Sequence, residues 1–112
     1  MNVAAIVAGL WPAFRKIITD IGRWLVGRIR RHGAKKLAAY MELRIDVFED
    51  RLARARRPHR QKWLRGRIRR WNNAIVWLEA NAAKFNKSVA DAIEKLAIAD
   101  RIPMRAPLER AA

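Results

Sequence analysis

Two runs of regularly spaced apolar residues constrain the fold of this 112-residue chain more than any other feature. Between residues 34 and 55, and again between residues 64 and 99, apolar side chains recur at alternating intervals of three and four positions. This spacing is typical of α-helices that pack side by side along a continuous seam. We assign to the central helix–helix seam Met41, Ile45, Phe48, Leu52, Leu64, Ile68, Trp71, Ile75 and Leu78.

The two runs do not share one helical phase. Continuing the first run past Pro58 would place His59 and Lys62 on the apolar seam. Proline disfavours helix in the residue before it and is well tolerated in the first turn of the next helix. We therefore predict that the chain reverses between about residues 56 and 59 to form an antiparallel hairpin. Folding back there pairs position 48 with 68 and position 45 with 71.

A third amphipathic helix is expected over residues 12–31, with Pro12 in its first turn and Gly33 ending it. Its apolar positions mirror those of residues 85–96, which predicts that this helix covers the part of the second arm that extends beyond the first. A pattern similar to a capping box at residues 88–91 indicates a further break in the second arm, near residue 86.

The sequence therefore predicts an all-α fold in one domain. The expected helices span about residues 12–31, 34–56, 59–85 and 88–99. An apolar segment, residues 1–11, precedes them, and an extended tail, residues 100–112, follows. Two arrangements remain open: an elongated helical hairpin, with a second arm running to 85 or 99, and a compact bundle of three or four helices.

Charge is concentrated at the predicted tip of the hairpin. The chain has a net charge of +15, with 18 Arg and 7 Lys, and residues 51–73 contain ten basic residues and no acidic one. Such a surface attracts phosphate-rich partners. No sequence-specific nucleic-acid motif is present, so we expect non-specific binding. The predicted polyanion-binding residues are Arg54, Arg56, Arg57, Arg60, Lys62, Arg65, Arg67, Arg69 and Arg70.

The N-terminal part of the chain permits a different interpretation. Residues 1–14 carry no charged side chain, and residues 3–29 as a whole resemble a cationic amphipathic helix of a membrane surface. No basic residues precede the apolar run, and it is shorter than the roughly 20 residues that span a bilayer, so we expect neither export nor a spanning helix. The predicted membrane or partner interface consists of Ile6, Leu10, Trp11, Phe14, Ile18, Ile21, Trp24 and Leu25.

Two tryptophans, Trp63 and Trp77, lie off the predicted seam, on the flank of the second arm. Tryptophan exposed among arginines suits base stacking, a protein interface or the headgroup region of a membrane. Both side chains would equally fit a second layer of core, and these interpretations remain open.

Residues able to support catalysis are scarce. The chain has no Cys and only two His, His32 and His59, and it lacks a nucleophile–base pair, a phosphate-binding Gly loop and a metal-ligand set. We expect a protein that is not an enzyme, with no cofactor, no metal and no small-molecule substrate.

Three functions fit these observations. The favoured one is a structural or accessory protein of a larger assembly, with protein partners or self-association and a cationic tip on nucleic acid. The size and charge of the chain and its lack of catalytic residues are typical of small minor proteins of bacteriophage particles. The alternatives are a membrane-associated protein and a free, non-specific nucleic-acid-binding protein. A cytoplasmic or virion location is favoured over secretion, and peripheral membrane attachment remains open.

Overall fold

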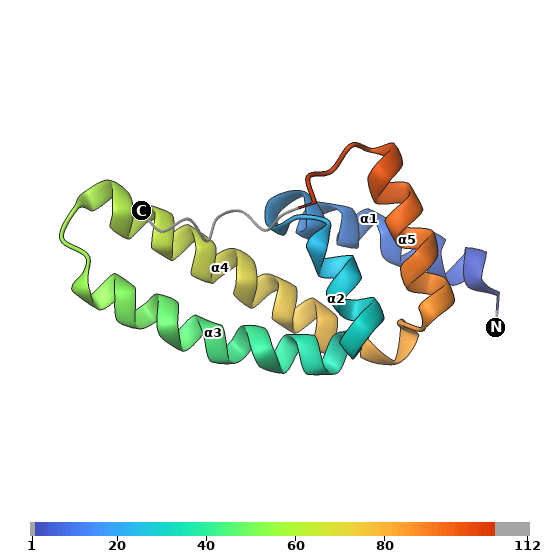
Figure 1. Cartoon of the computed structure of the whole chain (residues 1–112), viewed down its shortest axis with the longest axis horizontal. Helices are drawn as coiled ribbons and strands as arrows, with labels where there is room; N and C mark the ends of the chain where they lie inside the picture. Colours follow the sequence, from blue (N-terminus) through green and yellow to red (C-terminus); the bar gives the residue numbers. More distant parts are fainter. Residues whose placement is uncertain (1, 105–112) are drawn as a thin grey trace.

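The computed structural model describes residues 2–104, and this part of the chain folds almost entirely into α-helices (Figure 1). A short 3-10 segment, η1, Ala82–Lys84, connects the fourth and fifth helices. The helices are α1, Val3–Ile21; α2, Trp24–His32; α3, Ala34–Arg54; α4, Pro58–Ala80; and α5, Lys87–Ala99. The predicted all-α fold is confirmed.

Helices α3 and α4 form the predicted antiparallel hairpin, with Pro58 as the first residue of α4. The side-chain amide of Gln61 donates a hydrogen bond of 2.8 Å to the carbonyl of Ala55, across the loop. Along the seam, the rings of Phe48 and Trp71 meet edge to face with their centroids 5.1 Å apart. Most of the predicted seam is buried, and two of its members are partly buried, Leu52 and Ile68.

The molecule measures 50 × 26 × 20 Å, and the hairpin runs along its longest axis. Helices α1 and α2 pack against one half of the hairpin and α5 packs on them, while the half that carries the 55–57 loop projects as an arm two helices thick (Figure 1). The structure thus combines the two arrangements left open by the sequence. A bundle forms one end and an elongated hairpin forms the other.

The first helix starts earlier than predicted. It begins at Val3 and continues through Pro12, so residues 1–11 are not a segment separate from the helix. The side-chain oxygen of Asn2 accepts a hydrogen bond of 3.0 Å from the Ala4 amide and caps the helix. Leu10 is buried in the common core, and such burial outweighs the backbone hydrogen bond that Pro12 cannot form.

The predicted helix over 12–31 is divided in two by a turn at Gly22. This residue has φ 112° and ψ 159°, a conformation open essentially only to glycine, and its amide donates 2.7 Å to the carbonyl of Ile18. The three-to-four spacing of apolar residues continues from Ile21 to Leu25 across the turn, so periodicity does not reveal it. The predicted end at Gly33 is confirmed, with φ 85°.

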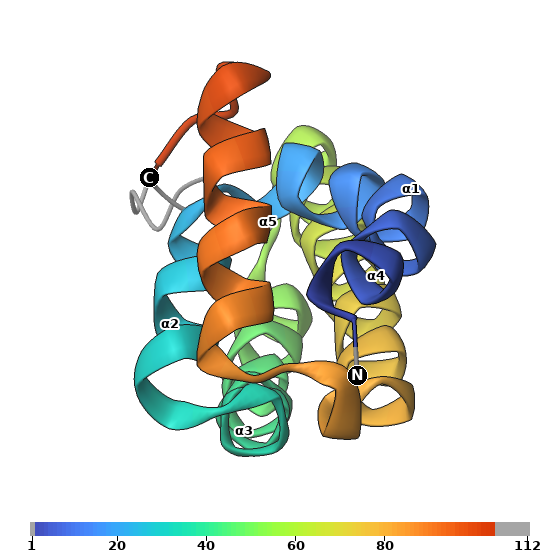
Figure 2. The same ribbon diagram turned by 90° about the vertical axis from the view of Figure 1, so that its right-hand side faces the viewer.

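The predicted break in the second arm is present, but α4 ends at Ala80 rather than near residue 85. The cap of α5 is Asn86 rather than Ser88 of the predicted pattern, and its side-chain oxygen accepts a hydrogen bond of 2.9 Å from the Val89 amide. Helix α5 lies across both α1 and α2, which confirms the predicted pairing of the N-terminal helix with this segment (Figure 2). Because α5 leaves the line of α4, Leu96 and Ala99 are exposed rather than part of one continuous seam.

Residues 100–104 are not an extended tail detached from the core. Ile102 is 5% exposed, and Arg23 donates hydrogen bonds to its carbonyl and to that of Pro103, at 3.1 and 2.6 Å. These bonds attach the end of the described chain to the turn between α1 and α2. The remainder of the predicted tail, residues 105–112, lies outside the described residues.

Candidate polyanion-binding site

Basic side chains cluster on the outer face of the first half of α4. Lys62, Arg65 and Arg69 are spaced three and four residues apart, on the side of the helix opposite the seam, and all three are exposed. They border a hollow of about 520 Å3. The residues that line it are His59, Lys62, Trp63, Arg65, Gly66, Arg69 and Arg70.

Gly66 allows the guanidinium of Arg70 to reach this hollow. A Cβ atom at position 66 would lie 3.0 Å from Nη1 of Arg70, which is closer than ordinary van der Waals contact. The guanidinium therefore lies back across the helix, over the position where a side chain would otherwise stand. A fourth predicted residue thus joins the same hollow.

The other predicted residues of the hairpin tip are more dispersed. Arg56 and Arg57 are exposed in the loop. Arg54 is exposed and forms an ion pair of 3.3 Å with Asp50, four residues earlier on α3. Such exposed pairs contribute little free energy, so Arg54 remains able to exchange partners. Arg60 is partly buried, and its guanidinium carbon lies 5.9 Å from the ring centroid of Trp63.

Arg67 does not belong to the exposed surface on which the charge pattern placed it. It is 1% exposed, and its guanidinium carbon lies 4.9, 5.4 and 5.3 Å from the ring centroids of Phe48, Trp63 and Trp71. These are cation–π distances in a desolvated setting. The prediction for Arg67 is therefore wrong, because its side chain turns inward to fill the interface between α3 and α4.

A sequence signal for the burial of Arg67 exists. Trp63, Arg67 and Trp71 are four residues apart, so they form one stripe on α4 that borders the seam. Aromatic residues at positions four before and four after an arginine favour stacking of its planar guanidinium between them. Counting charge alone misses this pattern.

Ion pairs compensate positive charge at the opposite end of the molecule. Arg15 on α1 pairs with Asp100 at 2.7 Å, and Arg30 on α2 pairs with Asp91, at 2.8 Å, and with Glu94. By contrast, the residues Lys62, Arg65 and Arg69 have no carboxylate partner within residues 2–104. The strongest uncompensated positive charge therefore lies on the projecting arm.

The two tryptophans that the sequence left undecided take different positions. Trp77 stacks on Phe14, with centroids 4.8 Å apart and ring planes inclined by 6°, and it also contacts Phe85. It therefore forms a second layer of core between α4 and α1. Trp63 remains partly exposed at the edge of the hollow, next to the Arg60 side chain.

Most of the predicted membrane or partner interface is used to build the core. Five of its members are buried: Leu10, Phe14, Ile18, Ile21 and Leu25. The other three, Ile6, Trp11 and Trp24, are partly buried. A groove of about 730 Å3 remains between α1 and α5, lined by apolar side chains such as Val3, Trp11 and Leu96, with Lys95 at its border. Among the described helices, none is long and apolar enough to cross a bilayer.

Within residues 2–104, no group of three or more His, Asp or Glu side chains is arranged to hold a metal ion. Comparisons with protein-family models, curated proteins and solved structures found no match for this chain. The functional argument therefore depends on the surface chemistry of α4 and of the helices around it.

Proposed function

We propose that this protein binds nucleic acid without sequence specificity through the outer face of α4, as a non-enzymatic accessory component of a larger assembly such as a virus particle. The supporting observation is the hollow where Lys62, Arg65 and Arg69, without carboxylate partners in the described chain, lie beside the partly exposed Trp63. Arginine guanidinium groups suit phosphate oxygens, and tryptophan offers a stacking surface.

The shape of the molecule supports this assignment. The projecting arm carries the hollow away from the bundle of α1, α2 and α5 (Figure 1), so a long polymer can approach it without meeting the rest of the protein. Exposed apolar side chains elsewhere support protein contacts: Leu43 is 70%, Val76 69% and Ile98 52% exposed. Protein contacts on the body and polyanion contacts on the arm are compatible in one assembly.

The test is the salt dependence of binding. On duplex DNA, each phosphate neutralised contributes about 0.9 to the magnitude of the slope of log K against log salt. For the triple variant Lys62→Gln, Arg65→Gln, Arg69→Gln, we expect this magnitude to be smaller by about 2.7 than that of the unaltered protein. When salt is raised from 50 to 200 mM, the affinity of the variant for a labelled 20-base-pair DNA should therefore fall by a factor about 40 times smaller than the affinity of the unaltered protein falls.

A matched control removes the same charge from other surfaces. The variant Lys35→Gln, Lys36→Gln, Lys84→Gln alters three exposed residues outside the arm's outer half, and we expect its slope to stay within one unit of the original. Equal slopes for the two triple variants would refute the assignment of the α4 face, because charge alone would then determine binding. Lack of DNA binding by the unaltered protein at 50 mM salt would refute the proposed function itself.

A second candidate function is peripheral attachment to a membrane, and the apolar groove between α1 and α5 favours it. Trp11 lines this groove and suits the interfacial zone of a bilayer. The test is flotation with vesicles that contain anionic lipid. The second function predicts flotation that Trp11→Ser abolishes, and a protein that stays in the soluble fraction would exclude it.

A further inference from the structure

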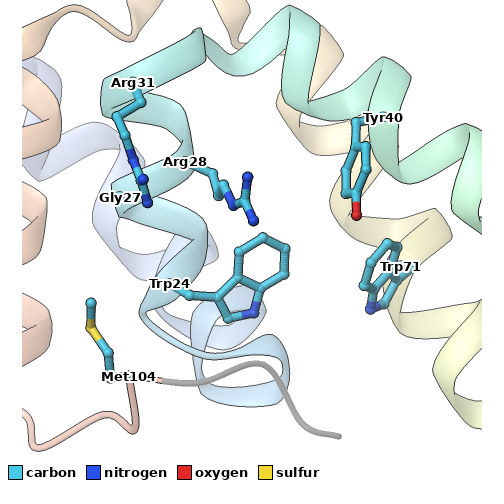
Figure 3. A pocket seen from close by; sticks show the side chains of 7 residues that line it. All are labelled: Trp24, Gly27, Arg28, Arg31, Tyr40, Trp71 and Met104. Carbon is cyan, nitrogen blue, oxygen red and sulfur yellow. The ribbon is translucent and has the colours of Figure 1, made fainter. Parts of the chain in front are cut away.

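A pocket of about 270 Å3 lies where α2 meets the hairpin (Figure 3). It joins residues that are far apart in the sequence, and we call it the Trp24 pocket. In Figure 3, the Trp24 ring lies at its centre, with Arg28 above it and the Tyr40 and Trp71 rings on the opposite wall. The volume is below the roughly 300 to 1,000 Å3 of sites for drug-sized ligands, so the pocket suits one flat ring system.

The Trp24 ring in the wall of the pocket is fixed by a hydrogen bond to the backbone and by contact with Trp71. The indole Nε1 of Trp24 donates 3.1 Å to the carbonyl of Ile21, which fixes the ring orientation in the first turn of α2. Trp24 and Trp71 have centroids 6.2 Å apart and ring planes inclined by 43°, so they form a wedge rather than a closed stack. Trp24 is only partly buried and retains surface for a further aromatic ring.

Polar groups around this wedge suit a nucleotide. Arg28 and Arg31 line the pocket from the same helix, and both are exposed. The Arg28 guanidinium carbon lies over the Trp24 ring, 5.8 Å from its centroid, so a cation is present at the stacking surface itself. On the other wall, the Trp71 ring is almost fully buried, at 2% exposed, so it forms a fixed apolar surface of the pocket.

The Trp24 pocket and the hollow on α4 are connected through the interior of the hairpin. A series of packed arginine and aromatic side chains joins them, with Trp63 at the hollow, Trp24 at the pocket, and the buried Arg67 and Trp71 in between. The series is Arg60, Trp63, Arg67, Trp71, Trp24 and Arg28, with distances of 5.9, 5.4, 5.3, 6.2 and 5.8 Å between neighbours. Proteins that bind single strands combine cationic side chains with aromatic stacking platforms, and here both kinds of side chain are accessible at the two ends of the series, at the hollow and at the Trp24 pocket.

We infer that the Trp24 pocket binds one unstacked base of single-stranded nucleic acid, with the adjacent phosphate on Arg28 and Arg31. The inference rests on the proposed function, because the strand is held by the α4 face, and it adds a preference for single strands over duplex. In a duplex the bases are stacked and paired, so they do not reach such a pocket.

Gly27 offers a way to fill the pocket without removing any of these groups. It lines the pocket in the interior of α2, and a Cβ atom there would meet no other atom within 4 Å. Leucine also favours helix more than glycine does, so Gly27→Leu is compatible with the fold. A second variant, Arg28→Gln with Arg31→Gln, removes the phosphate contacts by changing only exposed side chains.

The experiment measures the anisotropy of a labelled 12-nucleotide oligothymidine and of a 12-base-pair duplex at one salt concentration. We expect Gly27→Leu to weaken binding of the single strand roughly 5- to 150-fold, the range for loss of one stacked base, and to leave duplex binding unchanged. The Arg28, Arg31 variant should likewise weaken single-strand binding more than duplex binding. An oligonucleotide with abasic sites throughout should bind the unaltered protein at least as weakly as oligothymidine binds the Gly27→Leu variant, because the abasic strand also loses stacking on Trp63.

The outcomes separate this inference from the proposed function. If Gly27→Leu, folded by circular dichroism, binds oligothymidine as well as the unaltered protein does, the pocket inference is overturned while binding through α4 stands. The same holds if abasic and intact strands bind equally. If the unaltered protein binds neither single strand nor duplex, both proposals fail. If the α4 triple variant weakens both ligands and Gly27→Leu weakens only the single strand, both are supported.

Discussion

Replacing Phe14 by alanine tests whether the apolar face of α1 packs in the core or stays unpacked in solution and binds a membrane. Phe14 is 0% exposed and lies between two aromatic rings, stacked on Trp77 at 4.8 Å and edge-on to Phe85 at 5.5 Å. Truncating a buried phenylalanine costs about 3 to 5 kcal/mol. The two aromatic contacts, each worth about 0.5 to 1.5 kcal/mol, place the expected loss for Phe14→Ala in the upper half of that range.

Such a loss is a large share of the total stability. A domain of this size has a free energy of unfolding of about 5 to 15 kcal/mol, so Phe14→Ala should lower the urea midpoint markedly. Because 1 kcal/mol corresponds to about 4 to 8 °C in Tm for a domain near 100 residues, Tm should fall by at least about 16 °C. Circular dichroism and tryptophan fluorescence both report the transition, and Trp77 is in direct contact with the altered site.

Leu43→Ala serves as the control for this experiment. Leu43 is 70% exposed on α3, so its truncation removes apolar surface that is already in water and should change stability by less than about 0.5 kcal/mol. If Phe14→Ala costs no more than Leu43→Ala, the packing of α1 on α4 is refuted. A helix that undocks in solution and reserves its apolar face for a bilayer would give that result.

Two further predictions concern the hairpin interior and the turn between the first helices. Arg67→Met should leave the salt slope of duplex DNA binding unchanged, because Arg67 is 1% exposed, whereas Arg65→Gln should lower its magnitude by about 0.9. A lower slope for Arg67→Met would show that this arginine reaches the ligand. Gly22→Ala should destabilise the protein by about 1 to 3 kcal/mol, because φ 112° strains any residue with a Cβ atom. Gly27→Ala, in the interior of α2, should instead stabilise the protein by about 0.5 to 1 kcal/mol. If urea denaturation showed Gly22→Ala to be more stable than Gly27→Ala, the backbone conformations given for these two glycines would be wrong.

The hairpin was predictable because two independent signals agree at one place in the sequence. Apolar spacing defines the two helices, and Pro58 coincides with the change of phase between them. At the N-terminus, similar signals conflict. Pro12 is a typical first-turn residue, yet it lies in the middle of α1. The burial of Leu10 in the core stabilises the helical turn before Pro12, so the helix begins earlier than the proline suggests. The turn at Gly22 leaves no trace in the periodicity, since a glycine within an amphipathic pattern is also compatible with continuous helix.

The candidate site was predictable only in part, for a related reason. Lys62, Arg65 and Arg69 share a helix face that follows from their spacing, so their common surface can be derived before the fold is known. The inward direction of Arg67 depends on Phe48, which α3 supplies from across the hairpin. The Trp24 pocket depends on three helices meeting, and no local pattern relates positions 24, 40 and 71.

The ion pairs of α5 affect how the protein approaches a partner from a distance. Residues 74–104 contain equal numbers of acidic and basic residues, and three of the acidic ones, Asp91, Glu94 and Asp100, pair with Arg30 of α2 or Arg15 of α1. Positive charge is in excess on the projecting arm, so it is unevenly distributed along the long axis of the 50 Å molecule. For the polyanion partner proposed above, we expect this distribution to favour approach with the hairpin loop forward. Association should then slow as salt is added, because salt screens the attraction that orients the protein.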